Sequence, residues 1–145
     1  RIEMGHVAGS ELDGRTTPFD NSLDGLISKK KDFIGKRSLQ KEAYIAPDRE
    51  KIVGVVPIDK KTSIPEGSYI VKDPNAKLPN PKLGHVSASC WSVEYNNPFS
   101  LAIIKDGKNM IGQKLFALSP LKNKSIPVEI VSSHYVDPKG ERVRS

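Results

Sequence analysis

Hydrophobic residues gather in short runs over the last two thirds of the chain. The runs lie at residues 51–57, 68–72, 83–91, 99–105, 114–118 and 126–131, and the run at 99–105 is the most apolar. Prolines, glycines and asparagines separate them, and short segments between such turns are typical of antiparallel β-structure. We therefore expect six short strands arranged as an antiparallel barrel or sandwich. Gly54, inside the first run, predicts a bend or a close backbone contact.

The first part of the chain is polar and irregular. Residues 1–16 contain three glycines among charged residues, which predicts loops with a brief strand at the start. Thr17, Pro18 and Asp20 follow the order of a helix start. Threonine can cap a helix, proline suits its first position, and aspartate can reach back as a capping-box acid.

One amphipathic helix is expected before the strands begin. Leu39 and Ala43 lie four residues apart among charged residues, which predicts a helix over residues 35–44. Pro47 ends this helix. We therefore expect a first domain over residues 1–46 and a second over residues 47–145.

The densest basic run of the chain lies between these two parts, at residues 28–39. Its cations are Lys29, Lys30, Lys31, Lys36 and Arg37, and the apolar pair Phe33–Ile34 lies among them. A fully solvated charge run has no need of such a pair, which therefore predicts a basic loop anchored to a core. The cations could meet an anion or could simply form a solvated surface.

Composition limits the class of protein. The 145 residues carry 23 Lys and Arg against 17 Asp and Glu, a net charge of +6. This excess favours an anionic partner without choosing among nucleic acid, a polycarboxylate ligand and an acidic protein face. With Cys90 as the single cysteine, no disulfide can form within the chain and no thiolate metal cluster is expected.

The same single cysteine fits a reducing, cytoplasmic setting. No apolar run approaches the roughly 20 residues that a membrane span needs, and the start shows no signal peptide. The sequence begins with Arg1 rather than Met. We therefore expect these residues to continue a longer polypeptide.

Few residues suggest catalytic chemistry. The chain has no P-loop and no dinucleotide-binding glycine fingerprint, and His6, His85 and His134 are too scattered to predict a metal site. The alternating Ser87 and Ser89 are typical of one polar strand face rather than of nucleophiles. We expect no catalytic residue in this chain.

Three other side chains allow more than one interpretation. Cys90 is expected to be a small buried hydrophobic residue. Trp91 is either a core residue, which is favoured, or a flat wall for a ring ligand. Arg1 and Glu3 would share one face of a strand and could hold a planar hydrogen-bonding ligand or a carboxylate.

Five motifs lie in register over nearly all of the chain. In order they are Arg1-Ile2-Glu3-x-Gly5, Thr17-Pro18-x-x-x-x-Leu23, Asp32-Phe33-Ile34-Gly35-Lys36-x-x-Leu39, Gly84-His85-Val86-Ser87 and Leu101-Ala102-Ile103. Together they resemble the C-terminal part of the glycine-cleavage T-protein (aminomethyltransferase) family. Within that family, residues 9–18, 28–39 and 135–142 are most similar to the α subunits of heterotetrameric sarcosine oxidases.

The resemblance implies a fold and an activity. It implies a small antiparallel β-barrel over residues 47–145, preceded by the tail of an α+β folate-binding domain, and thus a mainly β chain with a short α segment. Such enzymes oxidatively demethylate sarcosine at a flavin, and their α subunit captures the one-carbon unit with tetrahydrofolate. Flavin and NAD would bind on parts not present in this chain, so the chain alone is expected to be inactive.

The resemblance also implies binding residues. Arg1 stands where the arginine of the family's R-x-E-x-G motif lines the folate pocket, and Glu3 would orient it. Asp20, Lys31, His85 and Trp91 are expected at the pocket or at an interface. The implied partners are the upstream part of the α subunit, the other sarcosine oxidase subunits and the folate ligand, with no membrane.

Two alternatives to the folate function remain open. The chain could be a non-catalytic basic β-barrel that docks to partner subunits, or one that binds nucleic acid. Nucleic acid is the less favoured partner, because aromatic residues make up only 6% of the chain and are not spaced like a base-stacking platform.

Overall fold

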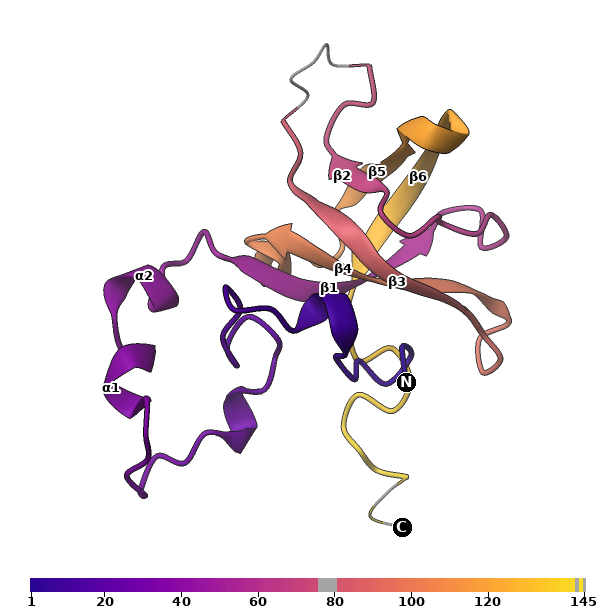
Figure 1. Cartoon of the computed structure of the whole chain (residues 1–145). Coiled ribbons are helices and arrows are strands. Elements are labelled where there is room, and N and C mark those ends of the chain that lie inside the picture. The colour runs from indigo at the N-terminus through magenta and orange to yellow at the C-terminus, as the bar shows by residue number, and fades with distance from the viewer. Residues whose placement is uncertain (76–80, 143, 145) are drawn as a thin grey trace.

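A computed structural model describes residues 1–75, 81–142 and 144 of the chain. Over these residues, six antiparallel strands close into a barrel in the order β1-β4-β3-β2-β5-β6 (Figure 1). The strands are β1 (Glu50–Pro57), β2 (Tyr69–Val71), β3 (Gly84–Ser92), β4 (Asn97–Lys105), β5 (Lys114–Ser119) and β6 (Lys124–Val131). The expected mainly β fold with a small antiparallel barrel is confirmed.

Two apolar clusters explain why β1 and β4 are hydrophobic on both faces. One cluster draws residues from every strand and fills the barrel; from β1 it takes Val53 and Val55. The other lies on the opposite face of β1 and β4 and includes Ile52, Val56 and Phe99. Side chains alternate between the faces of a strand, so a strand buried on both sides must be apolar throughout.

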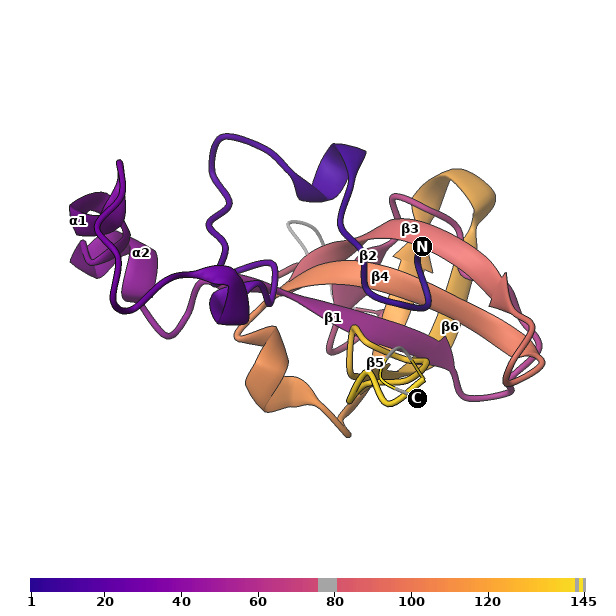
Figure 2. The same cartoon turned by 90° about the horizontal axis from the view of Figure 1, so that it is seen from below.

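The two ends of the chain cover this outer face of the barrel. Ile2, Val7 and Tyr135 pack against the outer cluster. The main-chain oxygen of Glu3 accepts hydrogen bonds from the amides of Tyr135 and Val136, at 2.9 and 3.1 Å. The N-terminal turn and the C-terminal segment therefore lie side by side below the sheet (Figures 1 and 2).

Short helices complete the structure. They are the 3-10 helices Gly9–Glu11, Asp24–Leu26, Gly107–Met110 and Pro120–Lys122, and the α-helices α1 (Lys36–Leu39) and α2 (Glu42–Ile45). Figure 2 shows α1 and α2 extending away from the barrel with the chain that leads to them. No helix among the described residues is long and apolar enough to cross a bilayer.

Three local predictions need correction. The single helix over 35–44 is wrong, because the chain is extended at Lys41 and splits it into α1 and α2. Neither short helix buries a residue, so no packing favours a longer one. No strand forms at the start of the chain, where residues 2–5 make a turn. Asn97 and Pro98 lie between the runs 83–91 and 99–105, where a turn is expected, but they pair with β3 as part of β4.

The prediction that Phe33 and Ile34 anchor the basic run to a core is also wrong. Ile34 is fully exposed and Phe33 is 37% exposed. Neither residue belongs to the two apolar clusters of the barrel, and Phe33 instead lines a surface cavity with Phe19, Ile27 and Leu39. The close backbone contact expected at Gly54 is confirmed, because a Cβ there would lie 2.4 Å from the main-chain oxygen of Ser132.

Candidate functional site

Arg1 lies at the start of the N-terminal turn, with its guanidinium fixed on one side. Nη1 donates a hydrogen bond to the main-chain oxygen of His6 at 2.8 Å and lies 3.4 Å from Oε2 of Glu11. The Arg1 side chain is 42% exposed, whereas that of Glu11 is buried. The bonds that Arg1 makes within the described residues use Nη1, so Nε and Nη2 can still meet a ligand.

The turn itself depends on a glycine. Gly5 has φ +68°, and a Cβ there would lie 2.8 Å from the main-chain oxygen of Ser133. Only glycine adopts this conformation without strain, and only glycine lets the two backbones come so close. The glycine of the Arg1-Ile2-Glu3-x-Gly5 motif therefore sets the position of Arg1 against the C-terminal segment.

Two carboxylate oxygens near this turn lack a donor. Oε1 of Glu3 and Oε1 of Glu11 are buried and have no hydrogen-bond partner among the described residues. The partner of the Arg1 guanidinium is Glu11, where the sequence predicted Glu3. A buried carboxylate oxygen without a donor is costly, so both atoms are acceptors whose donors do not lie among the described residues.

Cys90 lies close to the same turn. It is half-buried and packs against the outer apolar cluster with Ile2 and Val7. Burial raises the pKa of its thiol, and the nearby negative charge of Glu3 raises it further. The thiol therefore stays protonated at neutral pH and packs as a small side chain.

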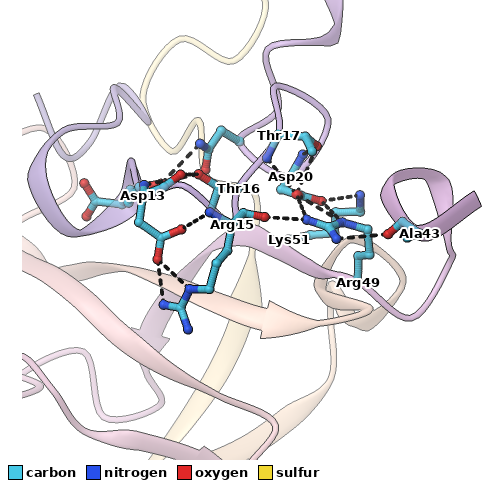
Figure 3. Close-up of polar contacts among 10 residues, drawn as sticks. Asp13, Arg15, Thr16, Thr17, Asp20, Ala43, Arg49 and Lys51 are labelled. Carbon is cyan, nitrogen blue, oxygen red and sulfur yellow. Dashed lines mark hydrogen bonds and ion pairs between the residues drawn. The ribbon is translucent and has the colours of Figure 1, made fainter. Parts of the chain in front are cut away.

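Asp20 is the centre of a second polar cluster, which joins the N-terminal segment to β1 (Figure 3). Its carboxylate is 3% exposed and pairs with Nη2 of Arg49 at 2.5 Å and Nζ of Lys51 at 2.9 Å. It also accepts hydrogen bonds from the amide and hydroxyl of Thr17, both at 2.9 Å. The contacts expected for a capping box thus form, but they close a turn at residues 18–22 instead of starting a helix.

Arg49 extends this cluster to two further segments. Its Nη2 donates to the main-chain oxygen of Arg15 at 2.8 Å, and its Nη1 donates to that of Ala43 at 3.0 Å. One guanidinium therefore ties the loop before Asp20, helix α2 and strand β1 together (Figure 3).

The charges around Asp20 determine its protonation. Burial alone would raise the pKa of the Asp20 carboxyl, but hydrogen bonds from Arg49, Lys51 and Thr17 outweigh burial and hold that pKa well below its usual range. Asp20 is therefore ionised throughout the physiological range.

His85 and Asp20 meet at one cavity of about 100 Å³ between the N-terminal segment and the barrel. Its lining is mostly polar and consists of Ser10, Asp13, Arg15, Thr16, Asp20, Glu50, His85 and Ile103. His85 reaches it from β3, where it pairs with Ile103 of β4. Within the described part of the chain, no group of three or more His, Cys, Asp or Glu side chains is arranged to hold a metal ion.

The other two predicted site residues lie apart from these clusters. Lys31 is exposed in the segment before α1, where its amide donates to Oγ of Ser28 at 2.9 Å. Trp91 is 52% exposed at the end of β3, opposite Pro98. The favoured interpretation of Trp91 as a core residue is wrong, because its side chain is half-exposed and belongs to neither apolar cluster.

Sequence reasoning missed Glu11, Arg49 and Lys51. Glu11 lies in a polar, glycine-rich stretch where nothing local distinguishes a buried carboxylate from an exposed one. Arg49 precedes β1 and Lys51 is its second residue, and the role of both depends on Asp20 about 30 residues earlier. A contact this distant leaves no periodic pattern in the sequence.

The fold has a counterpart among solved structures. The glycine cleavage system aminomethyltransferase T from Bartonella henselae matches 94% of this chain with a TM-score of 0.74 and 20% sequence identity, over 37% of its own length. No protein-family model matches the chain. The barrel and the segments that cover it are therefore those of an aminomethyltransferase-type fold.

Sequence comparison identifies the relatives more closely. The chain is 37% identical to the sarcosine oxidase subunit alpha of Rhizobium meliloti and 34% identical to that of Corynebacterium sp. strain P-1, each over 145 residues. It is 30% identical over 129 residues to the aminomethyltransferase of Listeria monocytogenes, covering 88% of this chain and 33% of that protein. The chain spans 15% of the length of both subunits. This confirms the resemblance: the chain is homologous to the C-terminal part of sarcosine oxidase α subunits.

Proposed function

We propose that this chain is part of a sarcosine oxidase α subunit, and that it forms one wall of the site where tetrahydrofolate captures the one-carbon unit released from sarcosine. The similarity to sarcosine oxidase α subunits over 145 residues supports this assignment. Below, the longer polypeptide that would contain this chain is called the parent subunit.

The observation that carries the proposal is the half-exposed guanidinium of Arg1, held by Glu11 and His6. Tetrahydrofolate carries carboxylates on its glutamate tail and a carbonyl on its ring. A guanidinium with Nε and Nη2 available can bind either group through two parallel hydrogen bonds. Glu3 would belong to the same wall, with its Oε1 buried and without a donor among the described residues.

The division into domains belongs to the proposal. Residues 1–46 would be the end of the folate-binding domain, and residues 47–145 the barrel that supports it. The Asp20–Arg49 ion pair lies across this boundary and would hold the two together. Flavin and NAD would bind elsewhere on the parent protein, and the other subunits would be its partners.

The experiment uses the parent subunit assembled with its partner subunits. Sarcosine oxidation is followed by hydrogen peroxide release, and folate capture by 5,10-methylenetetrahydrofolate formation at varied tetrahydrofolate. Arg1→Ala should raise the KM for tetrahydrofolate roughly tenfold or more, because a charge-assisted hydrogen bond is lost, and leave sarcosine oxidation unchanged.

The matched control is Arg37→Ala, which removes an exposed arginine of α1. This variant should leave both activities unchanged. An unaltered KM for tetrahydrofolate in Arg1→Ala would contradict the proposal. A parallel loss of peroxide release would also contradict it, because a general loss of folding or assembly would then explain the result.

A further inference from the structure

Glu11 is a buried charge that the proposed folate contact does not itself use. The residue is fully buried, one carboxylate oxygen has no partner among the described residues, and the other lies 3.4 Å from Arg1. Burying an ionised carboxylate is unfavourable unless its interactions compensate. Capping the amide of Ala8, at 2.9 Å, does not need a charge, because a neutral amide oxygen would accept that bond equally well.

Hydrogen bonds hold the backbone of Glu11 in place. It ends the 3-10 helix Gly9–Glu11, where its amide donates to the main-chain oxygen of Ala8 at 3.2 Å. Its own main-chain oxygen accepts a hydrogen bond from Nδ2 of the buried Asn21, also at 3.2 Å. Asn21 is the neighbour of Asp20, so Glu11 is connected to the cluster that fixes the N-terminal segment to β1.

Arg1, unlike Glu11, is half-exposed and is held by few contacts. It precedes the turn, its side chain is half-exposed, and apart from His6 its guanidinium contacts only Glu11 among the described residues. A long side chain loses considerable rotamer freedom when a ligand orders it. A fixed anion beside Nη1 removes part of that cost beforehand and leaves Nε and Nη2 for the ligand.

We infer that Glu11 is a positioning residue: it holds the Arg1 guanidinium in the orientation that binds the anionic or carbonyl part of the folate. This inference rests on the proposed function. It adds that the affinity for folate depends on a carboxylate that does not touch the ligand.

The test is a double-mutant cycle in the assembled enzyme with tetrahydrofolate as the probe. Glu11→Gln keeps an acceptor for the amide of Ala8 and removes the charge. It should raise the KM for tetrahydrofolate about three- to tenfold without changing peroxide release. In an Arg1→Ala background, the same substitution should have no further effect, because Glu11 acts through Arg1.

Two other variants complete the design. Glu11→Asp keeps the charge but withdraws it from Arg1, so its KM should lie between wild type and Glu11→Gln; it replaces Glu11→Gln in the cycle if that variant does not assemble. Glu42→Gln removes an exposed glutamate of α2 and should change nothing.

The outcomes separate the two claims. If Arg1→Ala leaves the KM unchanged, the proposed function fails and the inference fails with it. If Arg1→Ala raises the KM but Glu11→Gln does not, or if the two effects multiply in the double variant, the proposed function stands and the positioning role is overturned.

Discussion

Asp20 and Arg49 form a multidentate ion pair across 29 residues of sequence: Nε lies 3.1 and 3.2 Å from the two carboxylate oxygens, and Nη2 lies 2.5 Å from Oδ2. The main-chain oxygen of Asp20 also accepts a hydrogen bond from the amide of Ile52 at 2.8 Å. The side chain and the backbone of one residue thus fasten the N-terminal segment to β1. Without this contact, the segment that carries Arg1 would be held by fewer bonds.

Removal of the Asp20 charge should destabilise the fold. Asp20→Asn leaves Arg49 and Lys51, whose side chains are 21% and 16% exposed, without their counter-ion. We expect urea unfolding of the chain to show a loss of about 3 kcal/mol, the usual cost of breaking a buried pair from one side. Asp13→Asn is the control, because its partner Arg15 is solvent-exposed. An equal loss in both variants would argue against a special role for the Asp20 cluster.

The same contact should make stability depend on pH. The pKa of Asp20 is lower in the folded chain than in the unfolded chain. The ion pair therefore stabilises the fold fully above about pH 4, the pKa of a free aspartate, and this stabilisation is lost as the pH falls toward the folded-state pKa. Urea unfolding between pH 2 and 7, as approximate limits, should show the difference between wild type and Asp20→Asn shrinking on the acid side. A constant difference would contradict this assignment.

A single methyl group should disrupt the β3–β4 pairing. A Cβ at Gly84 would lie 2.0 Å from the main-chain oxygen of Ile103 and 2.8 Å from Cα of Ile104. Because both are backbone atoms of a paired strand, no side chain can move to make room. We expect Gly84→Ala to lower the free energy of unfolding by about 3 kcal/mol. Gly14→Ala, where a Cβ would meet nothing within 4 Å, should cost little.

The packing of the C-terminal segment on the barrel should depend on the aromatic ring of Tyr135. The Tyr135 ring stacks on Phe99 with centroids 4.5 Å apart, and its hydroxyl accepts a hydrogen bond from Nδ2 of Asn97 at 3.1 Å. Tyr135→Phe removes only the hydrogen bond and should cost about 1 kcal/mol. Tyr135→Ala removes the stacking as well and should cost about 3 kcal/mol. If the two variants unfold alike, the stacking contributes little.

The strands were predictable because their signal is local. β1 and β4 appear as continuous apolar runs, and both are buried on two faces. The start of β4 was not predictable, since Asn97 and Pro98 have turn-forming side chains and join the strand through pairing with β3. The break between α1 and α2 was missed for a related reason. Four-residue spacing predicts a helix only where an apolar face has something to pack against.

The candidate site was predictable only in part. The motif that contains Arg1 and Gly5 directed attention to the start of the chain, although a strand was expected there and a turn forms. Asp20 was singled out because the residues around Thr17 have the pattern of a helix cap. The partners of these residues were hidden, because Glu11 and Arg49 act through contacts that only the folded chain creates. Phe33 and Ile34 show the opposite error, in which an apolar pair suggested an anchor and the structure exposes it.

The most direct test of the folate site is the structure of the assembled parent enzyme with 5-formyltetrahydrofolate, a chemically stable tetrahydrofolate. The proposal predicts an oxygen of the ligand within about 3 Å of the Arg1 guanidinium, with Glu11 still beside Nη1. A ligand bound in the enzyme with Arg1 out of contact would contradict the assignment of this chain to the folate pocket.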